Sequence, residues 1–163
     1  MTNSETDWYE ETEMSACYNQ LARCYIAVGD FDNALKYYEK CMEFEKKVST
    51  IKTSVNTDFS AFVVKNNLKQ FYGKAVEMLE KSKDSNELIT IDDMFVYHAI
   101  RAIVLYEEGN KIVAIEEAKG AMKLLDVHKS QFKNHPGFGI VNPKRRAALI
   151  DKLSKILVQN SDL

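Results

Sequence analysis

Residues 18–41 read YNQLARCYIAVGDFDNALKYYEKC and carry the most structural information in the chain. Apolar residues recur there at the three- and four-residue spacing of an amphipathic helix, on both sides of one break. They are Tyr18, Leu21, Ala22, Tyr25 and Ile26 before the break, and Ala34, Leu35, Tyr38 and Cys41 after it. At the break, Gly29 can end one helix and Asp30 can cap the next, which would begin at Phe31. The stretch predicts two antiparallel helices joined by a very short turn.

The same helical periodicity continues through most of the 163 residues, and no segment alternates as a half-buried strand does. We therefore predict an all-α fold that forms a single domain over residues 1–163. Helical hairpins are expected over about 6–48, 57–83 and 90–127, with a last helix over about 142–159. Thr90 and Asp93 have the spacing of a capping box, and Asn142-Pro143 is typical of a helix start. Residues 57–83 fit either one long helix or two shorter ones.

The spacing of large and small residues in the first hairpin resembles the tetratricopeptide repeat family. If Ser15 is taken as position 1 of the repeat, eight positions carry the residue type typical of the family. These are Tyr18, Leu21, Ala22, Tyr25, Gly29, Ala34, Tyr38 and Cys41. A second stretch resembles the repeat around Gly109, and a weaker one lies between the two. The corresponding alanines Ala34, Ala75 and Ala114 are 41 and 39 residues apart, longer than the usual repeat of about 34.

This resemblance implies about three stacked antiparallel hairpins of roughly 40 residues and a C-terminal capping helix. It also implies a concave groove, lined by the first helix of each hairpin, that receives a peptide or a partner protein. By the family pattern, the residues expected to contact the partner are Asn19, Arg23, Ile26, Ser60, Val64, Asn67, Ala99, Ile103 and Tyr106. The lysine and asparagine of the family's chaperone-tail clamp are replaced by Asn19 and Arg23, so an extended peptide or amphipathic helix fits better.

Composition excludes several other classes of protein. The net charge is −2 and only 2 prolines occur, which favours helices and argues against a basic nucleic-acid binder. No run of 18 apolar residues predicts a membrane span, and the polar N-terminus lacks the features of a secretory signal. The 3 cysteines are expected to be free thiols, which makes the cytoplasm the expected location. Charge is uneven, since residues 1–14 contain five acids and no base, whereas residues 128–163 contain seven bases and two acids.

The sequence offers no pattern typical of catalysis or of a bound cofactor. His98, His128 and His135 have no cysteine or histidine at the spacing of a helical metal site. No glycine-rich phosphate-binding motif occurs, and adjacent carboxylates such as Glu116 and Glu117 point to different sides of a helix. We expect no catalytic residue, no metal and no cofactor.

Three functions remain open on sequence grounds. A non-enzymatic module that binds a protein or peptide, as an adaptor, peptide sensor or chaperone-like protein, is the first. An immunity or inhibitor protein that blocks a partner enzyme is the second, because an acidic N-terminal end suits a basic partner. An all-α enzyme or small-ligand binder is the third. A homo-oligomer is also possible, and neither nucleic acid nor membrane is an expected partner.

Overall fold

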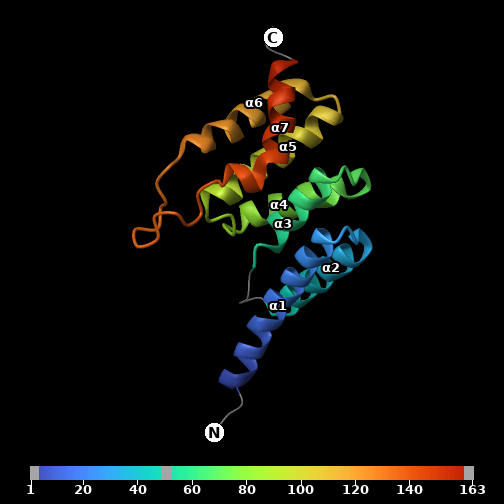
Figure 1. Cartoon of the computed structure of the whole chain (residues 1–163), viewed down its shortest axis with the longest axis vertical. Coiled ribbons are helices and arrows are strands. Elements are labelled where there is room, and N and C mark those ends of the chain that lie inside the picture. Colours follow the sequence, from blue (N-terminus) through green and yellow to red (C-terminus); the bar gives the residue numbers. More distant parts are fainter. Residues whose placement is uncertain (1–3, 49–52, 160–163) are drawn as a thin grey trace. The chain divides into compact units, whose positions relative to one another are not determined.

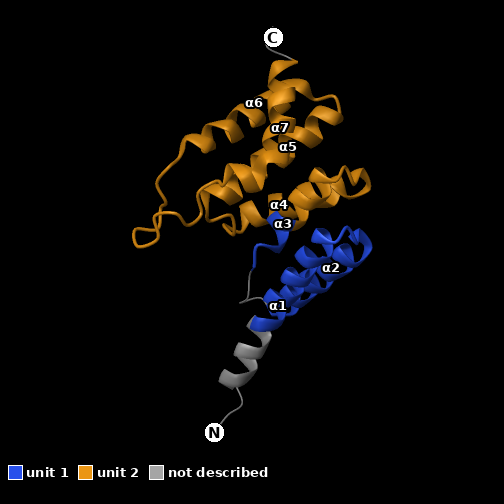
Figure 2. Ribbon diagram, in the orientation of Figure 1, with its two compact units in different colours: residues 1–58 blue, residues 59–163 orange. Residues whose placement is uncertain are grey.

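The computed structural model describes residues 4–48 and 53–159, and for residues 4–12 it describes the backbone alone. The acidic side chains of Glu5, Asp7, Glu10 and Glu11 therefore lie outside the described residues. Seven α-helices and two short 3₁₀ segments make up the regular structure of the described part, which contains no strand. The chain divides into two compact units, residues 1–58 and 59–163 (Figure 2). The all-α class predicted from the sequence is confirmed.

Unit 1 is built on the helical hairpin of α1 (Ser4–Ala27) and α2 (Phe31–Lys47). Gly29 has a φ of 79°, in the left-handed region that glycine adopts without strain. Asp30 caps α2, because its side chain accepts a hydrogen bond of 3.1 Å from the backbone N–H of Asn33. Ala22 and Ala34 are fully buried, so small residues allow the two helices to approach closely. The predicted turn and cap are both confirmed.

Contacts between aromatic side chains and between polar side chains stabilise this hairpin. The rings of Tyr25 and Tyr37 stack with centroids 5.3 Å apart and planes 13° apart. Inside the hairpin, the carboxylate of Glu45 accepts hydrogen bonds from Ser15 Oγ at 2.8 Å and from Thr53 Oγ1 at 2.6 Å. Because Glu45 is only 5% exposed, these donors are what its buried carboxylate requires. They also tie the residues after α2 back to α1.

The helix α3 (Val55–Lys65) spans the boundary between the units and begins two residues earlier than the sequence predicts. The reason is Thr53, whose Oγ1 accepts a hydrogen bond of 3.2 Å from the backbone N–H of Val55. The sequence analysis left open whether residues 57–83 form one helix or two, and the structure shows two. Asn67, with a φ of 54°, ends α3 in the left-handed conformation that asparagine tolerates. A 3₁₀ turn, η1 (Lys69–Phe71), then leads into α4 (Tyr72–Asp84).

Unit 2 is centred on α5 (Ile91–Glu107), which buries eight of its side chains. Its N-terminus carries the predicted capping box, in which Thr90 and Asp93 each accept a backbone N–H from the other. Gly109, with a φ of 89°, turns the chain into α6 (Lys111–Lys123), followed by the 3₁₀ turn η2 (Leu124–Asp126). The last helix, α7 (Pro143–Val158), packs along both α5 and α6 (Figure 1).

A buried ion pair connects α7 to the start of α5. Arg146 is 5% exposed, and its guanidinium binds both carboxylate oxygens of Asp92 at 3.0 and 2.6 Å. The segment between α6 and α7 folds back to the same place, where the backbone N–H of Asp92 donates to the carbonyl of Gly139 at 2.8 Å.

None of the helices in the described residues combines the length and apolarity that crossing a membrane requires.

Candidate partner-binding site

The structure buries five of the nine residues that the sequence analysis expected in a partner-binding groove. They are Asn19, Ser60, Val64, Ala99 and Ile103. Asn19 donates to Ser54 and Asp58 at 3.4 and 3.3 Å, so its amide holds unit 1 together. A role of these five residues in partner binding stays a sequence-based prediction. The groove described below does not include any of them.

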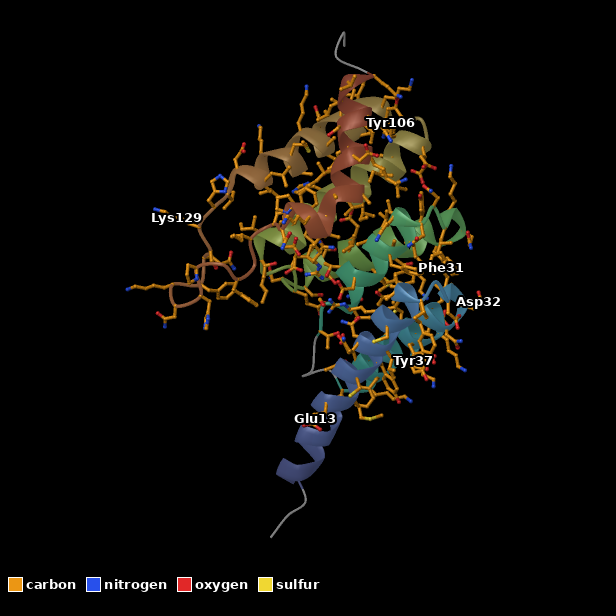
Figure 3. All side chains as sticks on the ribbon, viewed as in Figure 1. Glu13, Phe31, Asp32, Tyr37, Tyr106 and Lys129 are labelled. Carbon is orange, nitrogen blue, oxygen red and sulfur yellow. The ribbon has the colours of Figure 1, made fainter. Side chains whose placement is uncertain are left out.

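The other four predicted residues are exposed or half-buried. Arg23 is exposed and Ile26 is half-buried on the same turn of α1. Asn67 and Tyr106 are both engaged by α7, since Asn67 Oδ1 accepts a hydrogen bond of 2.6 Å from Lys152 Nζ. Tyr106, near the C-terminal end of α5 (Figure 3), donates its hydroxyl to Gln159 Oε1 at 3.0 Å. Within unit 2, the capping helix thus occupies positions that the family pattern assigns to a partner.

A groove of about 270 Å³ lies between α4 and α5, entirely within unit 2. It is lined from α4 by Gly73, Val76 and Glu77, and from α5 by Arg101, Val104, Leu105 and Glu108. Its lining combines aliphatic side chains with the charged side chains of Glu77, Arg101 and Glu108. The sequence analysis assigned none of these residues to a site, because its family pattern selected neighbouring positions of α5.

Gly73 contributes to this groove by lacking a side chain. Its backbone is helical, and a Cβ atom placed on it would meet nothing within 4 Å. Neither a left-handed backbone nor a close neighbour therefore explains a glycine here. Glycine is a poorer helix former than alanine by up to about 1 kcal/mol. What Gly73 leaves in return is open space beside the groove that it lines.

A network of charges surrounds Arg101, one of the residues that line the groove. Arg101 forms ion pairs with Glu80 of α4 and with Glu117 of α6, the second with 2.8 Å between Nε and Oε1. The other oxygen of Glu117 lies 2.6 Å from Nδ1 of His98. The positive charge of Arg101 is thus matched by two carboxylates of neighbouring helices, and the three helices α4, α5 and α6 are linked through it.

The pKa of Glu117 reports the balance of forces in this network. Burial opposes ionisation and would raise the pKa of Glu117. Hydrogen bonds from His98 and Arg101, together with their charges, outweigh burial, so the pKa lies below its usual value of 4.5. Glu117 therefore remains a carboxylate at neutral pH and keeps Arg101 in place.

Two acidic residues stand at the C-terminal end of α5, and the second of them, Glu108, lines the groove. Glu107 pairs with Lys69 at 2.6 Å, and the next residue, Glu108, is exposed and forms no ion pair with any described residue. Nearby in sequence to Gly73, the hydroxyl of Tyr72 is buried without a hydrogen-bond partner among the described residues. Burial and the charge of Glu107 both raise the pKa of Tyr72, so this hydroxyl stays neutral.

Two signals in the sequence could have pointed to the groove. Arg101 replaces an apolar residue at a core position of the repeat pattern, and Gly73 stands in a helical run. Their meaning depends on side chains of other helices, which sequence spacing does not reveal. Among the described residues, no three His, Cys, Asp or Glu side chains converge as a metal site would require.

Comparison with known proteins gives one match. Residues 15–47 match the family described as Tetratricopeptide repeat. These residues cover most of α1 and all of α2, so the hairpin of unit 1 is a tetratricopeptide-like repeat, as its residue pattern predicts. Neither a curated protein nor a solved structure matches the chain.

Proposed function

Because this chain carries a tetratricopeptide-like repeat, a motif typical of protein–protein interaction modules, we propose that it is a non-enzymatic module that binds a segment of another protein. The observation that carries this proposal is the groove between α4 and α5, with its aliphatic lining residues and the open space around Gly73. We place the bound segment in this groove. The groove belongs to unit 2 alone and does not require the concave surface that the family pattern implies.

The dimensions of the groove favour a peptide over a small molecule. Its volume of about 270 Å³ lies just below the range of small-molecule pockets, which is roughly 300–1,000 Å³. That space suits one or two side chains of an extended or helical segment. The half-buried side chains of Val76 and Leu105 offer them nonpolar surface, and burial of such surface drives most protein association.

Arg23 and Ile26 of α1 remain part of the proposal as a second contact surface. Both are accessible in unit 1, and both stand at positions that the family pattern assigns to the partner. Asn67 and Tyr106 fit this role less well, because α7 engages their side chains.

Selection from a displayed library of random peptides tests the proposed function. We expect enrichment of peptides that bind the chain saturably. Leu105→Asp places a charge among the aliphatic lining residues of the groove and should abolish their binding. Ile112→Asp is the matched control, because Ile112 is 74% exposed on α6 and lies outside the groove, so its replacement should leave binding intact.

The proposal is wrong if the library yields no saturable binder. It is equally wrong if peptides bind Leu105→Asp and the unchanged chain alike, provided that circular dichroism shows the variant to be folded. Gly73→Leu offers a second way to block the groove, since the added side chain enters open space and not the interior of unit 2.

A further inference from the structure

We propose that the segment bound by the α4–α5 groove is both apolar and basic. In this arrangement an aliphatic side chain of the partner rests on Val76 and Leu105, which are half-buried, and a neighbouring lysine or arginine meets the carboxylate of Glu108. The inference rests on the proposed function and names the chemistry of its partner.

The charged group of the groove that can form an ion pair with a ligand is a carboxylate and not a cation. Among the described residues, Arg101 is the one basic residue that lines the groove, and Glu80 and Glu117 already pair with it. The acidic residues Glu77 and Glu108 also line the groove. Glu77 is 2.6 Å from Lys81 on its own helix, so Glu108 is the lining carboxylate without a basic partner among the described residues.

Glu108 stands at an unfavourable place for a negative charge. It is the C-cap residue of α5, where the helix dipole is negative and favours a cation. Within the described part of the chain no lysine or arginine forms an ion pair with it. A basic side chain of a partner would satisfy both the carboxylate and the end of the helix, and this gain is available only in the complex.

Gly73 supplies the second, independent observation. It faces the groove from α4, opposite the residues of α5, and its missing side chain serves no packing need within the chain. A glycine there leaves room for the backbone or an aliphatic side chain of a ligand beside Leu105. A carboxylate and aliphatic side chains among the lining residues, with open space beside Gly73, together describe an apolar–basic segment.

The experiment uses the full chain and synthetic peptides of equal length in which leucine alternates with lysine, with glutamate or with serine. Binding is measured by fluorescence anisotropy at several salt concentrations. We expect the lysine peptide to bind at least about tenfold more tightly than the glutamate peptide, and its affinity to fall as salt rises.

Two variants separate the groove from general charge attraction. Glu108→Lys should weaken the lysine peptide by about tenfold and strengthen the glutamate peptide, and it should keep the fold, since lysine suits a helix C-terminus. Glu116→Lys makes the same change in net charge on exposed α6, outside the groove, and should leave both affinities nearly unchanged. Gly73→Leu should weaken the lysine peptide at least tenfold.

The possible outcomes separate failure of this inference from failure of the proposed function. Equal binding of the lysine and glutamate peptides, or equal effects of Glu108→Lys and Glu116→Lys, would overturn the inference. If peptides selected from a library still bind and lose affinity in Leu105→Asp, the proposed function survives that result and the basic character of the partner is wrong. If no peptide of any composition binds, the proposed function itself fails.

Discussion

Glu117 keeps its charge in a half-buried position because His98 and Arg101 both contact its carboxylate. Since its pKa is lowered in the folded chain, the unfolded chain takes up the proton first as the pH falls below 4.5. The stabilisation is therefore fully present above that value and is lost as the pH falls through the folded pKa. We predict that Glu117→Gln lowers the free energy of unfolding by about 1–2 kcal/mol at pH 7, and that this difference shrinks towards pH 3.

Urea denaturation at a series of pH values measures this difference. Glu116→Gln is the matched control, because Glu116 precedes Glu117 on α6 and is exposed. Its replacement should change the free energy of unfolding by less than about 0.5 kcal/mol at every pH. A destabilisation by Glu117→Gln that is the same at pH 3 and pH 7 would contradict the assigned role of the carboxylate.

The three cysteines differ in accessibility. Cys17 and Cys24 are exposed on α1, whereas Cys41 is buried. Burial raises the pKa of the Cys41 thiol, and hydrogen bonds from Ser15 and Thr53 offset this in part. Because the thiolate is the reactive form, we predict that a thiol-reactive chromophore modifies Cys17 and Cys24 rapidly in the native chain and Cys41 only on unfolding.

Mass spectrometry after brief labelling identifies the modified residues. Cys41→Ala should leave the rapid modification of Cys17 and Cys24 unchanged and should remove the modification that occurs only on unfolding. Rapid modification of Cys41 in the native chain would mean that the hairpin of unit 1 opens far more often than its buried polar contacts suggest.

At the scale of elements, the join between α7 and α5 depends on one buried ion pair. Arg146 is 5% exposed and binds Asp92 with two contacts. Removal of one member leaves the other charge buried and unpaired, which costs about 3–5 kcal/mol. We predict that Arg146→Met lowers the free energy of unfolding by about 3 kcal/mol in urea titrations. Arg145→Met is the control, since Arg145 lies 3.9 Å from the same carboxylate but is exposed, and it should cost less than about 1 kcal/mol.

The segment that leads into α7 is shaped by Gly139. Its φ is 74°, and an added Cβ would lie 2.9 Å from Cβ of Thr90, which caps α5. We predict that Gly139→Ala costs about 2–3 kcal/mol, because it combines a strained backbone with overlap of a helix cap. Gly109 also has a positive φ, but a Cβ added there would meet open space. Gly109→Ala should therefore lower the free energy of unfolding by only about 1 kcal/mol. Thermal unfolding of both variants checks this order, and equal costs would show that the overlap with Thr90 is relieved.

The sequence predicts individual elements well where the deciding contacts are local. Asp30 and Thr90 cap helices because each bonds a backbone N–H three residues away, and such spacing is visible in the sequence. The break between α3 and α4 could only be left open, because it depends on a left-handed Asn67 and not on a glycine. The groove escaped prediction for a similar reason, since Arg101 is placed by carboxylates on α4 and α6 that are 21 and 16 residues away in sequence.

At the scale of the whole molecule, the sequence predicts a single domain, whereas the contacts divide the chain into units of residues 1–58 and 59–163. Each unit buries its own core. In unit 1 this includes Tyr38 and Cys41, and in unit 2 it includes Ile100 and Leu153. A core of its own gives each unit the means to open separately.

Native-state amide hydrogen exchange distinguishes one cooperative molecule from two. Ile100 is fully buried on α5, so Ile100→Ala should cost about 3–4 kcal/mol of the free energy that protects unit 2. We predict that protection falls by this amount across α5, α6 and α7 and stays unchanged in α2. Ile112→Ala, at a side chain that is 74% exposed on α6, should change neither unit by more than about 0.5 kcal/mol. An equal loss of protection in α2 would mean that the units unfold together, as the single domain predicted from the sequence requires.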